Sequence, residues 1–158
     1  MIALAMEIRD DDLTGSEIAE FLAEHIEEMK AVAPRPESKH ALDLEGLRRP
    51  EITFWTVWDE GVLVACGALQ ELDERAAEIK SMRTASSHRR KGVASALLNH
   101  VLEVARERGY RSLSLETGSY AFFAPARALY EKFGFEYCGP FAGYQEDPYS
   151  VFMTKSFD

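Results

Sequence analysis

The stretch Arg89-Arg90-Lys91-Gly92-Val93-Ala94 decides the fold, because it joins a strand pattern to a helix pattern. Strand-forming residues run from Glu78 to Thr84 before it, and a helical pattern continues to about Arg108 after it. A glycine turn that enters a helix aims several backbone N–H groups at one point, where the helix dipole adds partial positive charge. With three cationic side chains beside it, the turn predicts a site for a multiply charged anion such as a diphosphate.

The charge around this turn departs from that of the whole chain, which has 158 residues and a net charge of −9. No acidic residue lies between Glu78 and Glu103, whereas Lys80, Arg83 and the three cations of the turn fall in that window. A solvated basic face is the ordinary interpretation of such a run, but its place at a strand–helix junction favours anion binding. The overall acidity argues against nucleic acid or an anionic membrane as a partner, and it is compatible with a cationic amine.

The composition, with 46% hydrophobic and 28% charged residues, is that of a soluble globular protein, and we expect one domain over residues 1–158. Cys66 and Cys138 lie in separate strand-like segments, without a partner at the spacing of metal ligands or redox motifs. Two buried, reduced thiols are therefore expected, which fits a cytoplasmic protein. The apolar start of the chain is too short for a signal peptide, and no stretch has the length of a membrane span.

The first half of the chain has the patterns of helices and of antiparallel strands. An apolar face with helical spacing runs from Ile18 to Met29, and a shorter helix is expected from His40 to Arg48. The strand-like segments, joined to the strand before the basic turn as an antiparallel meander, are residues 5–9, Ile52 to Trp58 and Val62 to Leu72.

The second half changes to a parallel pattern. The helix after Gly92 has a broad apolar face, closes at Gly109, and leads to a strand from Ser112 to Glu116. A strand–helix–strand unit with so short a crossover is right-handed and parallel. The remaining elements are a helix from Pro125 to Phe133 and strands over Phe135–Cys138 and Ser150–Phe157. The predicted fold class is α/β (α+β), with a mixed sheet of about six or seven strands and about four helices.

The basic turn lacks the usual nucleotide fingerprints but matches another pattern, Q/R-x-x-G-x-G/A, as Arg89-x-x-Gly92-x-Ala94. Glu78 lies in the strand before it, eleven residues ahead of Arg89. Residues 126–135, Ala-Arg-Ala-Leu-Tyr-Glu-Lys-Phe-Gly-Phe, match a late A-x-x-L-Y-x-x-x-G-F segment. In the order and spacing of these features, the chain from about residue 55 to its end resembles the GNAT acetyltransferase superfamily. The first 50 residues fit that family only loosely.

The resemblance implies a GNAT fold that binds acetyl-coenzyme A where the central sheet splays. The diphosphate is expected on backbone N–H groups of residues 90–95, with charge added by basic side chains. The loop residues expected at the diphosphate are Arg89, Arg90, Lys91, Gly92, Val93, Ala94 and Ser95. The pantetheine arm is expected to pair with the backbone of Met82, Arg83 and Thr84, where an N–H near Met82 would polarise the thioester carbonyl.

The resemblance also implies transfer of the acetyl group to a primary amine by direct attack in a ternary complex. Tyr130 matches the family's general acid for the leaving thiolate, although a tyrosine packed at the core edge explains the same helical pattern. Glu78 matches the base of several members, and an exposed carboxylate at a strand start is the alternative. Glu116 is the rival base, or a ligand of the substrate ammonium, because it ends the parallel strand where ligands of α/β folds lie.

Other functions and weaker candidates stay open. A module that binds or senses acyl-coenzyme A without transfer is the alternative function, and a phosphate or nucleotide site unrelated to coenzyme A is a third. The pairing of Glu78 with Tyr130 favours the enzyme, because a pure binder needs neither. The sequence does not decide between a small amine, an amino acid and a peptide amine as the acceptor, nor does it fix the oligomeric state, a homodimer included.

Three further positions carry expectations that the structure addresses. Phe123 stands where the family often has an asparagine that contacts the cofactor, so one expected contact is missing. His25 lies on an apolar helix face and is interpreted as a packed histidine; the histidines lack ligand spacing, so no metal site is expected. The segment from Tyr144 to Asp147 forms either an acidic lip for an amine or a solvated turn.

Overall fold

The computed structural model of the chain describes residues 6–32 and 44–157, and within these ranges the backbone forms one seven-stranded sheet. The strands are β1 (Met6–Asp10), β2 (Ile52–Asp59), β3 (Val62–Asp73), β4 (Ala76–Thr84), β5 (Ser112–Gly118), β6 (Glu136–Cys138) and β7 (Ser150–Ser156). The helices are α1 (Ser16–Val32), α2 (Leu44–Leu47), α3 (Val93–Glu107) and α4 (Ala124–Lys132), with 3-10 turns η2 (Ser86–His88) and η3 (Ala121–Phe123).

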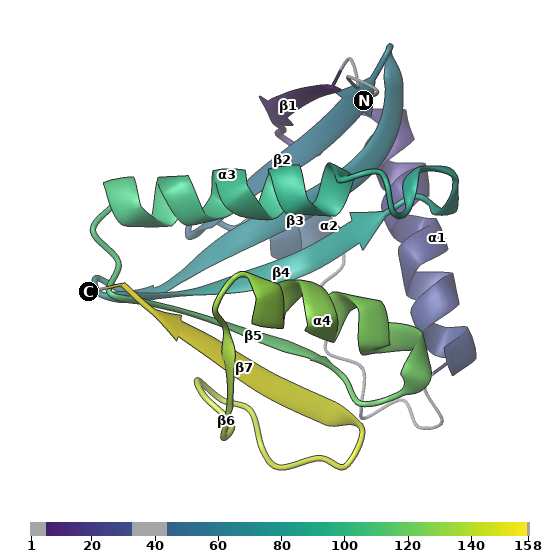
Figure 1. Ribbon diagram of the computed structural model, residues 1–158. Helices are drawn as coiled ribbons and strands as arrows, with labels where there is room; N and C mark the ends of the chain where they lie inside the picture. Colours follow the sequence, from purple (N-terminus) through teal and green to yellow (C-terminus); the bar gives the residue numbers. More distant parts are fainter. Residues whose placement is uncertain (1–5, 33–43, 158) are drawn as a thin grey trace.

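The sheet is mixed, with the strand order β1-β2-β3-β4-β5-β7-β6. Its parallel pair is β4 and β5, and the other neighbouring strands pair antiparallel. α3 forms the crossover between β4 and β5, so the predicted parallel unit follows the predicted meander (Figure 1). The mixed α/β fold class is confirmed.

Two hydrophobic cores hold the layers together, one on each face of the sheet. The larger core joins the apolar face of α3, including Leu97, Leu98 and Val101, to the inner strands and to Tyr130 of α4. The smaller core joins α1 and α2 to the opposite face of β2 and β3. At about 25 cal/mol per Å² of buried apolar area, burial on both faces is the main term that orders the sheet. α1 and the pair α3 and α4 therefore cover opposite faces of β4.

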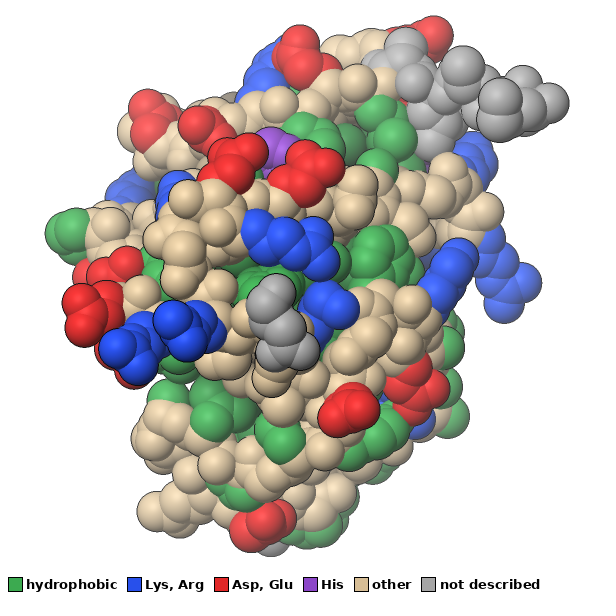
Figure 2. Space-filling view, turned by 60° about the vertical axis from the view of Figure 1, so that its left-hand side comes forward, with side chains coloured by type: hydrophobic (Ala, Val, Ile, Leu, Met, Phe, Trp, Pro, Cys, Tyr) green, Lys and Arg blue, Asp and Glu red, His purple; other side chains and the backbone are tan. Residues whose placement is uncertain are grey.

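The surface charge is uneven although the net charge is −9. On the face drawn in Figure 2, Lys and Arg side chains lie across the middle, with Asp and Glu side chains above and below them. Opposite charges so close together cancel beyond about 8–10 Å in physiological salt. The net acidity is therefore a poor guide to the potential at any single site.

The element boundaries agree with the sequence predictions to within one or two residues for most strands and for α3 and α4. Residues 40–43 of the expected second helix lie outside the described residues, and α2 covers the later part of that prediction. The prediction of two buried thiols is wrong for Cys138, which is exposed on β6. Burial raises the pKa of the Cys66 thiol to about 12. Of the helices described, none combines the length and the apolar character needed to cross a membrane.

Candidate active site

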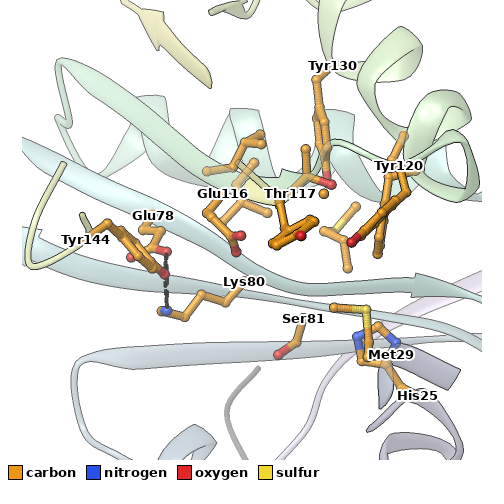
Figure 3. A pocket seen from close by; sticks show the side chains of 17 residues that line it. His25, Met29, Glu78, Lys80, Ser81, Glu116, Thr117, Tyr120, Tyr130 and Tyr144 are labelled. Atoms are coloured by element: carbon orange, nitrogen blue, oxygen red, sulfur yellow. Dashed lines mark hydrogen bonds and ion pairs between the residues drawn. The ribbon is translucent and has the colours of Figure 1, made fainter. Parts of the chain in front are cut away.

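The central feature of the site is a gap between β4 and β5. Their register runs from Ala76 opposite Ser112 to Ile79 opposite Leu115 and then stops, although both strands continue. β5 stays paired with β7, and β4 stays paired with β3. The described backbone of residues 80–84 therefore has no strand partner on its β5 side. A cavity of about 140 Å³ lies along this gap and is lined by residues of both strands (Figure 3).

A bulge in β4 shapes the lower wall of the cavity. Lys80 pairs with Ala68 and Arg83 pairs with Cys66, so β4 carries one residue more than β3 between these pairs. Ser81, inside the bulge, has a φ of 56°, and its carbonyl accepts the Cys66 thiol at 3.3 Å. A bulge bends a strand and changes which face its side chains take.

The bulge explains the glycine on the neighbouring strand. A Cβ atom at Gly67 would lie 2.5 Å from the Met82 sulfur and 3.2 Å from Leu97, so the close approach of β4 and α3 requires glycine there. Met82 packs toward α3, whereas Arg83 contacts Phe21 and the glutamates of α1. Successive residues therefore point to opposite faces of the sheet at the gap.

The basic turn forms the predicted helix N-terminus. Arg90 and Gly92 have φ values of 65° and 82°, and no side chain caps α3 at Gly92. In the part of the chain that the structure describes, the backbone N–H groups of residues 90–95 make no backbone hydrogen bond, and the first that does, Ala96, donates to Gly92 at 3.0 Å. Unpaired N–H groups at a positive dipole end are what a phosphate group requires.

The basic side chains near the turn differ in where they point. The guanidinium of Arg89, which is 47% exposed, lies 3.3 Å from Glu28 and 6.0 Å from the Phe122 ring. The side chain of Arg83 is only 9% exposed and pairs with Glu28 and Glu24 of α1. Arg89 is therefore available beside the turn, whereas the Arg83 side chain belongs to the α1 side of the sheet.

Glu78 lies in a buried polar cluster. It is 3% exposed, so the alternative of an exposed carboxylate is wrong. The Tyr144 hydroxyl donates to Glu78 Oε2 at 2.6 Å, and Lys80 Nζ lies 3.2 Å from the same oxygen and donates to Tyr144 at 3.0 Å (Figure 3). Burial and the Glu78 contact raise the pKa of Tyr144, which keeps that hydroxyl a donor. The cluster fixes one carboxylate oxygen of Glu78 and holds the loop of residues 139–149 against β4.

Glu116 and Tyr130 complete the catalytic candidates. The Ser150 hydroxyl donates to Glu116 Oε2 at 2.8 Å, and the carboxylate points into the cavity (Figure 3). Tyr130 is 6% exposed, its ring contacts Phe135, and its hydroxyl faces the cavity from α4 (Figure 3). Burial raises the pKa of Tyr130, so the hydroxyl keeps its proton at neutral pH. The structure thus brings Glu78, Glu116 and Tyr130 to one cavity from three elements.

Several cavity residues were not predicted as site residues, and His25, Tyr144 and Phe123 are the most informative of them. His25 of α1 lines the cavity although its spacing indicated packing, and Tyr144 reaches Glu78 from a loop that was expected to be an acidic lip or a solvated turn. Phe123 supplies an apolar wall where the family often has asparagine, and its ring packs so closely on Gly118 that a Cβ there would lie 2.1 Å away. The sequence indicated that His25 and Met29 share one face of a helix, but it did not indicate that this face lines a cavity.

Metal chemistry has no support among the residues described. In the ranges 6–32 and 44–157, no three His, Cys, Asp or Glu side chains gather where they could hold a metal ion. The polar groups of the cavity are two carboxylates, one ammonium, one imidazole, hydroxyl groups and the backbone of β4. These are groups for proton transfer and hydrogen bonding.

A mixed sheet that opens between parallel strands, beside an uncapped helix N-terminus, is the architecture of an N-acetyltransferase fold. The model of the acetyltransferase (GNAT) family matches residues 17–135, and the chain belongs to this family. The chain is 61% identical over 150 residues to the uncharacterized N-acetyltransferase YsnE of Bacillus subtilis, covering 95% of this chain and 99% of that protein. It is 48% identical to the uncharacterized N-acetyltransferase YedL of Escherichia coli, covering 93% and 92% of the two chains.

Solved structures share the fold at low sequence identity. A GNAT-family acetyltransferase of Staphylococcus aureus aligns with a TM-score of 0.76 at 19% identity, over 96% of this chain and 99% of that one. The PaiA N-acetyltransferase of Thermoplasma acidophilum, crystallised with coenzyme A, aligns with a TM-score of 0.74 at 16% identity, over 98% and 100% of the two chains. At these identities the likeness establishes the fold alone.

Proposed function

We propose that the protein transfers an acetyl group from acetyl-coenzyme A to a primary amine in a ternary complex. The observation that carries this proposal is the gap between β4 and β5. The cavity along this gap is lined by Tyr130, Glu78 and Glu116, and β4 leads through η2 to a helix N-terminus with unpaired N–H groups. An acyl carrier with a diphosphate tail needs both of these features.

In this proposal, each part of the cofactor binds a different group of the chain. The N–H groups of residues 90–95 would bind the diphosphate, and Arg89, Arg90 and Lys91 would add charge. The unpaired β5 side of Met82, Arg83 and Thr84 would pair with the amides of the pantetheine arm. Phe123 would contact that arm through apolar surface instead of a side-chain hydrogen bond.

The reaction follows from the groups at the cavity. The neutral amine attacks the thioester carbonyl, so a C–N bond forms and the C–S bond breaks. The backbone N–H near Met82 stabilises the carbonyl oxygen, and Tyr130 gives its proton to the leaving thiolate. The proton lost by nitrogen passes to Glu78, directly or through water. Glu116 holds the substrate ammonium before it loses its proton.

The geometry supports this division of roles between the carboxylates. Oxygen Oε2 of Glu78 is occupied by Tyr144 and Lys80, and among the described residues Oε1 has no hydrogen-bond donor. A fixed carboxylate with one open oxygen suits a base that must meet the nucleophile at a set angle. Glu116, which Ser150 anchors, lies on β5, the strand next to the one that carries Glu78.

The test is release of free thiol from acetyl-coenzyme A over a panel of primary amines, with the acetylated product identified by mass spectrometry. Thiol release that depends on an amine supports the transferase. Calorimetric binding of acetyl-coenzyme A without thiol release on any acceptor would favour the alternative, a module that only binds or senses the acyl carrier. Equal affinity for ADP and coenzyme A would overturn both.

A further inference from the structure

The buried side-chain nitrogens that lack a hydrogen bond come from α1 and β4. Within the described ranges they are His25 Nδ1, Arg83 Nε and Arg83 Nη1, and Nη1 lies 3.3 Å from Glu28 in an ion pair. His25 comes from α1 and Arg83 from β4, on the face of the sheet opposite α3. Buried donors are almost always satisfied, so a cluster of unsatisfied ones indicates a bound group.

Arg83 supplies fixed positive charge in the corner between α1 and β4. Its side chain is 9% exposed and its guanidinium lies 5.0 Å from the Phe21 ring. Its ion pairs with Glu28 and Glu24 are long, at 3.3 and 3.8 Å, and these carboxylates are 35% and 71% exposed, so they reach it from the solvent side. Among the described residues, the Nε of Arg83 has neither a hydrogen bond nor an ion pair, and a guanidinium is suited to a planar carboxylate.

His25 connects this charge to the cavity. It lines the cavity together with Lys80 and Ser81 of the β4 bulge, and Figure 3 shows His25 and Ser81 on the same wall. Burial, and then the charge of Arg83, lower the pKa of His25 to about 4. The imidazole is therefore neutral at pH 7 and carries one N–H donor. The corner is a donor-rich end of an otherwise acidic cavity.

The charges along the cavity are thus arranged as a dipole. His25 and Ser81 line the α1 end, and Arg83 lies beside them, paired with Glu24 and Glu28 of α1. The carboxylates of Glu78, which pairs with Lys80, and of Glu116 line the end near Tyr144 and Ser150. A small molecule with an amine and a carboxylate a few bonds apart carries the complementary charges. A simple alkyl amine would leave the α1 end without a partner.

We propose that the acceptor is a compact amino carboxylate of the α-amino-acid class. Its carboxylate accepts hydrogen bonds from His25 and Ser81 and is balanced by Arg83, while its amine lies at Glu78 and Glu116. The proposal rests on the acetyl transfer proposed above, and it names the substrate class of that same cavity. The cavity volume of about 140 Å³ fits small acceptors of this kind.

The first experiment compares amino acids with the amines that differ from them only by the carboxylate. The pairs are alanine and ethylamine, leucine and 3-methylbutylamine, methionine and 3-(methylthio)propylamine, and tyrosine and tyramine. Rates are expressed per concentration of unprotonated amine, because the carboxylate changes the amine pKa. We expect at least one amino acid to exceed its amine more than tenfold in kcat/KM. Equal values, or preference for the amine, in every pair would overturn the proposal and leave the acetyl transfer intact.

The second experiment locates the preference. Arg83→Gln and His25→Leu should each lower the ratio of kcat/KM for the preferred amino acid to kcat/KM for its amine about tenfold or more. Lys30→Gln is the matched control, because it removes an exposed cation of α1 that pairs with Glu27. An equal loss for amino acid and amine would show a structural role and overturn the assignment.

A binding measurement separates this proposal from the proposed function. Calorimetric titration of the coenzyme A complex with the amino acid and with its amine needs no turnover, and Arg83→Lys serves if Arg83→Gln does not fold. If the amino acid binds more tightly than its amine and the Arg83 variant loses this difference, the result supports carboxylate binding beside His25 and Arg83, even without thiol release. Absence of thiol release with every acceptor counts against the transferase. Equal binding of the amino acid and its amine counts against an amino carboxylate as the acceptor.

Discussion

The two ends of the site are built in different ways. The diphosphate end is one continuous segment, residues 89–95, whose left-handed residues Arg90 and Gly92 set the direction of six N–H groups. The acceptor end is assembled from α1, β4, β5 and the loop of residues 139–149, which meet only in the folded chain. A local segment can be recognised from spacing, whereas an assembled one requires the packing of the whole sheet.

The difference also separates what each end must do. In the proposed function, the diphosphate end binds one constant chemical group, for which backbone N–H groups are enough. The acceptor end has to distinguish amines and move protons, which requires side chains with set positions, such as Tyr144 against Glu78 at 2.6 Å. Changes at the first end should therefore act on cofactor affinity, and changes at the second on turnover or on the choice of acceptor.

The largest expected effect is that of Tyr130→Phe on turnover at the acceptor end. The substitution removes the buried proton donor and keeps the ring that packs on Phe135. We expect kcat to fall about 100- to 1,000-fold, as for loss of a general acid, with the KM for acetyl-coenzyme A within about threefold. Steady-state kinetics over pH 6–10 measure both. An unchanged rate and an unchanged pH profile would show that Tyr130 is a packing residue.

Glu78 of β4 and Glu116 of β5 offer the next test, because replacing either carboxylate by an amide should change a different kinetic parameter. Glu78→Gln is expected to lower kcat about 100-fold, since an amide cannot take the proton. It also leaves Lys80 without its ion pair, so the melting temperature should fall. Glu116→Gln is expected to raise the acceptor KM about tenfold with kcat largely kept. A loss of kcat in Glu116→Gln alone would exchange the two roles.

At the diphosphate end, Gly92→Val is expected to weaken coenzyme A binding about tenfold. A Cβ at Gly92 would meet nothing within 4 Å, so the cost comes from its φ of 82°, which a β-branched residue adopts poorly. A change in the backbone conformation of the turn would redirect the N–H groups of residues 90–95. Titration with coenzyme A measures the effect, and Gly15→Val is the control, since Gly15 also has open space but lies before α1. Full affinity in Gly92→Val would show that the turn does not bind the diphosphate.

The same division explains how far the sequence could be interpreted. The strands, α3 and α4 followed from periodicity and glycine caps, because each of these signals is local. Glu78 and Tyr130 became candidates through their match to the motifs of the family, and the structure places both at the cavity. The place of His25 at the cavity depends on how α1 packs against β4, and Tyr144 depends on a loop with no periodic pattern. The exposure of Cys138 was missed because β6 is a short edge strand, exposed along its length.

The smallest expected effect is a pH dependence of stability that belongs to the acceptor end alone. The pKa of His25 is about 4 in the folded protein and about 6.5 in the unfolded chain, so between these values the unfolded state binds more protons. Stability from neutral His25 is therefore complete above pH 6.5 and is lost as the pH falls toward 4. From pH 7 to 5.5, this residue should cost about 1 kcal/mol of unfolding free energy.

Urea unfolding of the wild type and His25→Leu at both pH values measures this contribution. His25→Leu should lose about 1 kcal/mol less than the wild type over that interval, whatever its absolute stability. Ile26→Val, a packing change on the same helix without a titratable group, should keep the wild-type pH dependence. If His25→Leu and the wild type lose equal stability, the imidazole is solvated in the folded protein. The buried corner beside Arg83 would then be open to water, and the charge arrangement inferred for the acceptor end would fail with it.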